Sequence, residues 1–186
     1  MKKTTKTIVW VVWAVVVLAA IGYVLKRYNI YQSGYVTYTS RDKSFSIEHP
    51  RNWLPQWEWK GAIVVSFATD SIPETSTVQP YINIAKWAMT WSLAEVYSGT
   101  LGEYQKLFRT FQIQSQSDDK INWADAKRLI FDGTLGWRSR RYEVVVCSKD
   151  SVIYTITASS APAVFDQVSK QVDRIIASWK FAQPTK

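Results

Sequence analysis

The sequence is poor in cysteine and histidine, and this scarcity excludes two common ways of building a small domain. The single cysteine, Cys147, cannot form a disulfide within the chain. It lies in an apolar segment, so we expect a small buried residue, with a reactive thiol as the alternative. The single histidine, His49, excludes a metal site made of several histidines. We expect no metal or cofactor, and a domain held together by its hydrophobic core alone.

Most of the chain has a smaller net positive charge than the overall composition suggests. The formal net charge is +8, but five of the 23 basic residues flank one apolar segment near the N-terminus, where no acidic residue occurs. Residues 28–186 therefore contain 18 basic and 15 acidic residues, a net charge of +3. This is an ordinary surface charge, and we expect no nucleic-acid binding.

The longest uncharged run covers residues 8–25. As a helix it would be about 27 Å long, close to the roughly 30 Å of a bilayer's hydrocarbon core. We predict an uncleaved membrane anchor. The alternative is a cleaved secretory signal, but such signals have apolar regions of about 7 to 15 residues, and the candidate site Ala20-Ile21-Gly22 is followed by more apolar residues.

The basic residues beside this run predict its orientation. Three lysines precede it and two basic residues follow it, which favours a cytoplasmic N-terminus and an extracytoplasmic C-terminal domain. The two sides of the run differ by only one basic residue, so the opposite orientation remains an alternative. The predicted organisation is an anchor at 1–27, a linker at 28–34, a domain at 35–181 and a tail at 182–186. The seven linker residues reach about 23 Å, so the domain would stay near the bilayer.

The remaining pattern predicts a single α+β domain with an antiparallel sheet packed by helices. Strands are expected at 35–39, 44–48, 61–67, 81–87, 111–115, 126–131, 137–147 and 152–157, the last three as an antiparallel meander. Turns are expected at 40–43, 118–120, 132–136 and 148–151, and a loop at 70–80.

Two helices are expected. Ser92-Leu93-Ala94-Glu95 is a capping box, and Gly99 and Gly102 are points where the helix that it opens could break. The apolar stripe of this helix consists of Leu93, Val96, Tyr97, Leu101, Tyr104, Leu107 and Phe108. The second helix opens near Pro162 and carries its own apolar stripe. The residues of this second stripe are Phe165, Val168, Val172, Ile175, Ile176 and Trp179.

One strand pattern has an aromatic-polar-aliphatic run, a proline and a tryptophan three residues later, in Phe45-Ser46-Ile47-Glu48-His49-Pro50-Arg51-Asn52-Trp53. Later segments follow it in a fixed order: Asn83-Ile84, Ser92-Leu93-Ala94-Glu95-Val96-Tyr97, Ala126-Lys127-Arg128-Leu129, and Ile175-Ile176-Ala177-Ser178-Trp179-Lys180-Phe181. In these segments and their order, the sequence over 35–181 resembles the PsbP/Mog1-like superfamily.

The resemblance implies an α/β/α sandwich around an antiparallel sheet, and it implies no single function. Members include photosystem II proteins, binders of a nuclear GTPase and bacterial exported or membrane-anchored domains; the predicted anchor makes the last type the nearest. His49 stands where members often carry tyrosine, so no metal site or photosystem contact is transferred to this chain.

Trp53, Trp57 and Trp59 fall within seven residues. We expect Trp53 to cap the core. Trp57 and Trp59 share a face if the segment is extended, and with Trp87 or Trp91 they could stack on a sugar ring, a peptide or lipid headgroups. The plainer alternative is that they pack against the sheet or a loop.

A second candidate binding site is Arg138, Arg140 and Arg141. Arg138 and Arg140 share a strand face, and with Lys127 or Arg128 across a hairpin they could hold an anionic headgroup or an acidic partner. The alternative is a solvated strand end.

Catalysis has little support in the sequence, and we predict no enzyme. No glycine-rich phosphate loop or metal-ligand cluster is present, and a nucleophile–base pair would need His49 beside Cys147 or a serine. The sequence predicts a membrane-anchored, non-catalytic binding or assembly module with a protein partner. The alternatives are a glycan- or lipid-surface binder that uses the tryptophans, and a small hydrolase.

Overall fold

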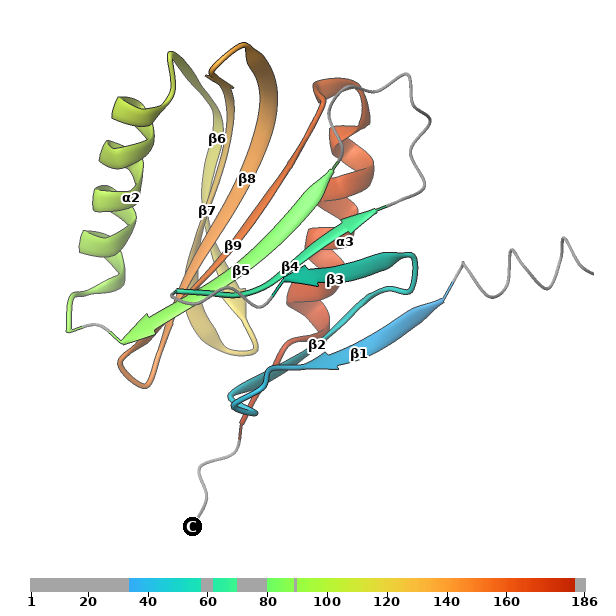
Figure 1. Cartoon of the computed structure of the whole chain (residues 1–186). Helices are drawn as coiled ribbons and strands as arrows, with labels where there is room; N and C mark the ends of the chain where they lie inside the picture. Colours follow the sequence, from blue (N-terminus) through green and yellow to red (C-terminus); the bar gives the residue numbers. More distant parts are fainter. Residues whose placement is uncertain (1–33, 58–61, 70–79, 89, 183–186) are drawn as a thin grey trace, which may run out of the picture. The chain divides into compact units, whose positions relative to one another are not determined.

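A seven-stranded antiparallel sheet carries one helix on each face (Figure 1). The structure, a computed structural model, describes residues 34–57, 62–69, 80–88 and 90–182, with the backbone alone at 56, 57 and 69. Its strand order is β3-β4-β5-β9-β8-β7-β6, and a smaller sheet has the order β1-β2-β10. The elements are β1 (Tyr35–Thr39), β2 (Phe45–Pro50), β3 (Trp53–Trp57), β4 (Ile63–Thr69), β5 (Tyr81–Ala88), α2 (Leu93–Leu107), β6 (Thr110–Ile121), β7 (Ala124–Leu135), β8 (Arg138–Lys149), β9 (Val152–Ser160), the 3₁₀ turn η1 (Pro162–Val164), α3 (Phe165–Ser178) and β10 (Lys180–Phe181).

Strand β8 lies inside the sheet and is buried on both faces over residues 142–147. Val144 and Val146 enter a core beneath α2, and Val145 and Cys147 enter a second core beneath α3. A strand that is apolar on both faces needs cover on both faces. This arrangement confirms the predicted antiparallel α+β domain, the expected meander and the burial of Cys147.

Helix α2 begins at the predicted capping box. The Ser92 Oγ accepts a hydrogen bond from the Glu95 N–H at 3.2 Å, and the Glu95 Oε2 accepts one from the Ser92 N–H at 2.8 Å. The helix continues unbroken to Leu107, so the break considered at the glycines does not occur. The prediction that Leu107 joins the apolar stripe is wrong, because the helix ends there and the extended Phe108 fills the core instead.

Helix α3 confirms its predicted stripe, since all six residues of that stripe are buried. Pro162 opens the preceding 3₁₀ turn, where its missing N–H costs no hydrogen bond. After the helix, Trp179 stacks on Phe45 of β2 with ring centroids 4.5 Å apart. This contact ties the smaller sheet to the core beneath α3.

Two predicted turns lie too early in the sequence. Strand β6 continues through 118–120, and β7 continues to Leu135, so only Gly136 of the predicted 132–136 turn lies between β7 and β8. Residues 118–120 lie in β6, where Asp118 is paired across the hairpin with Lys127 at 2.7 Å. Gly133 lies within β7, and a Cβ at this position would come within 2.8 Å of the Phe108 ring. Glycine is therefore required here for close packing against Phe108 and not for a turn. Strand β3, which pairs with β4, was also not predicted.

The turn between β6 and β7 is Asn122-Trp123, and both residues have positive φ, 43° and 72°. Two positive φ angles are typical of a type I′ turn, which favours glycine at the second position. A bulky residue is strained in this left-handed region. The Trp123 side chain is also 88% exposed, so no packing compensates for the strain.

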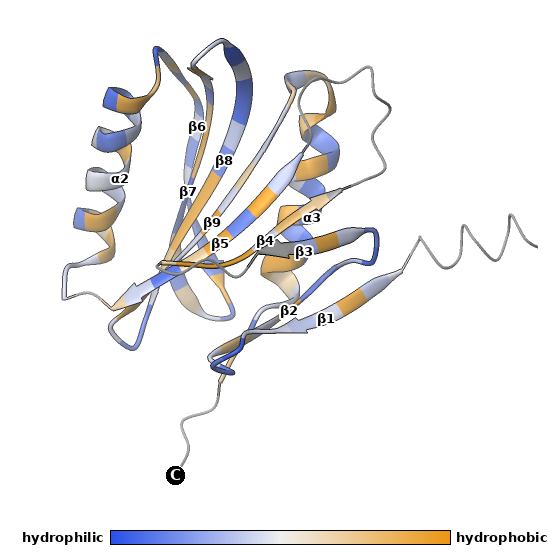
Figure 2. Cartoon of the chain, in the orientation of Figure 1, coloured by the Kyte–Doolittle hydropathy of each residue, from blue (hydrophilic) through white to orange (hydrophobic). Residues whose placement is uncertain are grey.

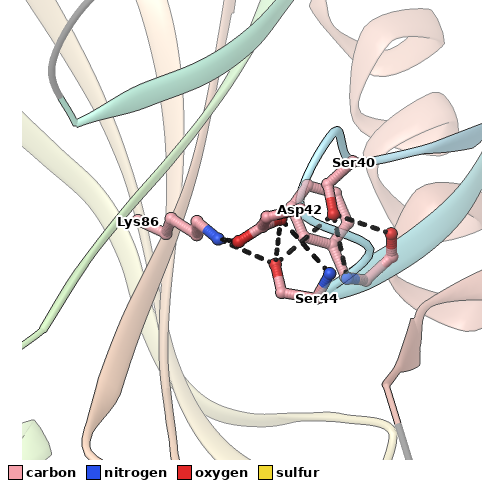
Figure 3. A network of polar contacts seen from close by, with 5 residues as sticks. Ser40, Asp42, Ser44 and Lys86 are labelled. Carbon is pink, nitrogen blue, oxygen red and sulfur yellow. Dashed lines mark hydrogen bonds and ion pairs between the residues drawn. The ribbon is translucent and has the colours of Figure 1, made fainter.

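A polar network joins the two sheets (Figure 3). The Lys86 Nζ on β5 donates to a carboxylate oxygen of Asp42 and to the Ser44 Oγ, the latter at 2.9 Å. Both partners belong to the β1–β2 turn, where Lys43 has a positive φ of 58°. The Ser40 Oγ closes the same turn by accepting from the Phe45 N–H at 3.1 Å. The network therefore fixes the end of the smaller sheet against β5.

Several predicted segments lie outside the described residues. These are the anchor at 1–27, the linker except for Gly34, nearly all of the loop at 70–80 and most of the tail. Within the described part of the chain, no helix is long and apolar enough to cross a bilayer.

We predict that Trp123→Gly stabilises the domain. Glycine removes a left-handed backbone strain of about 1 kcal/mol, and the exposed indole contributes no packing that would be lost. The expected increase in melting temperature is about 2–4 °C. Thermal unfolding followed by circular dichroism measures it, with Trp123→Ala as the control that keeps a Cβ and the strain. A lower melting temperature for the glycine variant would contradict this account of the turn.

Candidate functional site

The structure describes only part of the predicted tryptophan cluster. Trp53 is buried in the core beneath α3, 6% exposed, which confirms its predicted role as a cap. The Trp57 side chain and all of Trp59 lie outside the described parts, so their binding role stays a prediction. Of their possible companions, Trp87 packs against the core beneath α2, whereas Trp91 is 61% exposed.

The three predicted arginines have different environments at the start of β8, the blue stretch that precedes the hydrophobic centre of this strand in Figure 2. Arg138 is exposed and lies 4.5 Å from the Trp137 ring centroid. Arg140 is buried, stacks on Tyr81 at 4.8 Å and donates to the Ser159 carbonyl at 3.2 Å. Arg141 points to the opposite face and binds both Asp132 carboxylate oxygens, at 2.7 and 2.9 Å.

The structure does not bring these arginines together with Lys127 or Arg128. Arg140 is opposite Gly133 in the β7–β8 register, six residues and roughly 20 Å along the strand from Lys127. Lys127 and Arg128 are themselves engaged with aspartates. Of the predicted anion site, Arg138 alone is exposed at the strand end.

A cluster that the sequence analysis missed is centred on Arg128. Its guanidinium contacts carboxylate oxygens of Asp119 on β6, Glu143 on β8 and Asp173 on α3, each at 2.7 Å. The cluster therefore ties three strands to the helix above them. The sequence signal for this cluster was Glu143, a charged residue on the same strand face as the apolar residues Val145 and Cys147.

Glu143 is fully buried in this cluster. Burial raises the pKa of its carboxyl group to about 7, because desolvation outweighs the attraction of the Arg128 guanidinium. Such a shift is typical of functional sites and also of structural ion pairs. Here the carboxyl group is enclosed between the sheet and α3, which makes it a structural group.

The two residues considered for nucleophilic chemistry are both enclosed. Cys147 is fully buried, and burial raises the pKa of its thiol to about 12, so the thiol stays protonated at neutral pH. His49 is 5% exposed, and burial lowers its pKa. Its Nδ1 donates to the Pro50 carbonyl at 2.9 Å, and its ring lies 4.4 Å from that of Phe67. In the described part of the chain, no group of three or more potential ligand side chains could hold a metal.

An open hollow of about 600 Å³ lies between Leu93 of α2 and the β6–β7 hairpin. Its charged lining residues are all paired: Lys127 with Asp118, Lys120 with Asp125, and Asp119 with Arg128, each at 2.7 Å. Ligand sites for small molecules are mostly apolar, with a few converging polar groups. This charged, self-paired hollow lacks that character.

Two highly exposed tryptophans occupy hairpin turns and were not singled out from the sequence. Trp123 lies between β6 and β7, and Trp137, 77% exposed, lies between β7 and β8. The available signals were Asn122-Trp123, where a hairpin turn would favour Asn-Gly, and Gly136-Trp137 between two strand patterns.

Solved structures with a similar arrangement of helices and strands identify the fold. The yeast Ran-binding protein Mog1p (Saccharomyces cerevisiae) matches with a TM-score of 0.61 at 6% identity, over 80% of this chain and 96% of its own. Cyanobacterial PsbP, CyanoP, from Synechocystis sp. PCC 6803 matches at 0.59 and 12% identity, over 81% and 94%. The domain has the PsbP/Mog1-like fold. LpqN of Mycobacterium tuberculosis, involved in cell envelope biogenesis, matches at 0.58 and 14% identity, over 81% and 91%.

The match confirms the predicted resemblance at the level of the fold. No family model and no curated protein matches the sequence. At these identities a PsbP/Mog1-like domain shares its architecture with the matched proteins, and its own surface has to indicate what it binds.

We predict that the Glu143 carboxyl group makes the stability of the PsbP/Mog1-like domain depend on pH. Its pKa is raised in the folded state, so the folded protein holds a proton that the unfolded protein releases above pH 4.5. This contribution is complete below pH 4.5 and is lost as pH rises through 7. It amounts to about 3 kcal/mol, since each pKa unit is worth about 1.4 kcal/mol.

The Glu143→Gln variant tests this, because glutamine has the shape of the protonated acid. Urea unfolding at pH 4.5 and 7.5 should show the variant gaining about 3 kcal/mol over the wild type across this interval. The control is Glu103→Gln, an exposed carboxylate paired with Lys106, which should show no such gain. A constant difference between Glu143→Gln and wild type would contradict a raised pKa.

Proposed function

We propose that this chain is a single-pass membrane protein whose PsbP/Mog1-like domain lies outside the cytoplasm and acts as a non-catalytic binding or assembly module. The observation that carries the proposal is the position of the uncharged run at 8–25, which ends ten residues before β1 begins at Tyr35. A run of this length suits a bilayer, and the positive-inside bias favours export of the domain.

The start of β1 supports a short tether. The Tyr35 hydroxyl donates to Gln171 Oε1 at 2.6 Å, and the Arg174 guanidinium lies 3.5 Å from the Tyr35 ring centroid. These two contacts hold the first residue of β1 against α3. The seven preceding residues, at a reach of about 23 Å, would hold the domain close to the membrane.

The environments of the described side chains support a binding role and not a catalytic one. The thiol of Cys147 and the imidazole of His49 are enclosed, and the hollow beside α2 is lined by paired charges. Among the similar structures, Mog1p is a Ran-binding protein and LpqN is involved in cell envelope biogenesis. A protein partner is therefore the partner class we propose. The glycan-binding alternative rests on Trp57 and Trp59 and stays a prediction.

Topology can be tested by cysteine labelling, because the native Cys147 is fully buried and should not react. Two variants of the full chain are needed: Ser117→Cys on the exposed edge of β6, and Thr5→Cys on the N-terminal side of the uncharged run. In intact cells, a membrane-impermeant maleimide should label Ser117→Cys and leave Thr5→Cys unlabelled. Both should be retained in the membrane fraction after an alkaline carbonate wash.

The unaltered chain is the control and should take up no label. Labelling of Thr5→Cys alone would reverse the orientation. A mature, freely dissolved chain that lacks its first two dozen residues would remove the anchor from the proposal.

A further inference from the structure

One end of the domain combines exposed apolar side chains with two arginines that form no ion pair with a described residue. The β7–β8 turn and the end of α2 lie at the same end of the domain (Figure 1). They are joined where the Arg109 N–H donates to the Thr134 carbonyl at 2.9 Å. We call five exposed residues of this end the tip surface: Leu107, Arg109, Leu135, Trp137 and Arg138.

The turn presents Trp137 to solvent without strain. Gly136 has a φ of 63° and Trp137 does not have a positive φ, as in a type II′ turn with glycine first. The indole is 77% exposed, and Leu107 and Leu135 are 58% and 47% exposed. Large apolar side chains that gather at one exposed place typically mark an interaction surface.

The cations of the tip surface are free to meet an anion. Neither Arg109 nor Arg138 forms an ion pair with a described residue. The neighbouring carboxylates are already matched, Asp132 by Arg141 and Glu103 by Lys106. The tip surface therefore carries two uncompensated positive charges beside its apolar side chains.

The opposite end of strand β7 provides an internal comparison. Trp123 is even more exposed, at 88%, and lies about 40 Å from Trp137 along the twelve residues of the strand. At that end Lys120 pairs with Asp125 and Lys127 with Asp118, so the cations are matched by acids. Of Trp123 and Trp137, only Trp137 has cations beside it that no described acid matches.

We propose that the tip surface docks on the anionic lipid surface of a bilayer. The five exposed side chains of the tip surface are all apolar or cationic. Tryptophan favours the membrane interface, and arginine is attracted to anionic headgroups. The inference rests on the proposed function, because the predicted anchor would hold the domain beside such a surface.

The full chain reconstituted into vesicles tests this proposal. An environment-sensitive fluorophore is attached to Ser139→Cys, which is exposed beside the tip surface, or to Ser117→Cys, which is exposed farther along the sheet. Vesicles contain phosphatidylcholine alone or phosphatidylcholine with phosphatidylglycerol. With the anionic lipid, the emission of the Ser139→Cys dye should shift to shorter wavelength, and that of the Ser117→Cys dye should not.

Substitutions then test the chemistry. Arg109→Gln with Arg138→Gln should lower the docked-to-undocked ratio about thirty-fold, and Arg109→Lys with Arg138→Lys should keep it. Trp137→Ser should lower the ratio about tenfold, whereas the matched Trp123→Ser should leave it unchanged. Added salt should weaken docking, because it screens the headgroup charge.

The outcomes distinguish a failure of lipid docking from a failure of the proposed membrane anchor. A chain that reconstitutes but shows no shift at Ser139→Cys overturns the tip surface and leaves the anchor in place. A chain that does not reconstitute overturns the proposed function. An equal emission shift on uncharged vesicles also overturns docking on anionic lipid. If Trp137→Ser abolishes capture of a protein partner but does not change the dye emission, the tip surface binds a protein and not lipid.

Discussion

The rest of the structure depends on the need to cover both faces of β8. Six consecutive buried residues in this strand leave no face that water can reach, so one helix must pack on each side. The chain meets this need with α2 on one face and α3 on the other. Strands β7 and β6 continue the sheet on one side of β8, and β9, β5, β4 and β3 continue it on the other. The smaller sheet packs with α3 through Phe45 and Trp179.

This arrangement leaves two large apolar side chains exposed at hairpin turns, Trp123 and Trp137. The charged groups that enter the layers are used to hold the layers together: Arg128 joins three carboxylates between the sheet and α3, and Arg140 stacks on Tyr81. The thiol and the imidazole are enclosed as well. These features agree with the binding or assembly module that we propose for this PsbP/Mog1-like domain.

The structural features that the sequence predicted well depend on neighbours within one helix or one strand. The capping box at Ser92 and the stripe along α3 are set by spacings of three and four residues. The turn at Asn122-Trp123 was missed because Asp118 and Asp119 resemble turn residues until their partners across the hairpin are known. Gly133 was mistaken for a turn residue because the ring that excludes its side chain belongs to Phe108, 25 positions away.

The sequence by itself determined the fold class, the apolar faces of the helices, the burial of the lone cysteine and the uncharged run that we interpret as an anchor. Only the tertiary structure decided which polar and aromatic side chains remain available. Arg140 and Arg141 are adjacent in sequence, yet each is occupied by a different partner, while Arg138 stays exposed. Local periodicity tells which face a residue occupies, but the strand register and the packing of distant elements determine what that face meets.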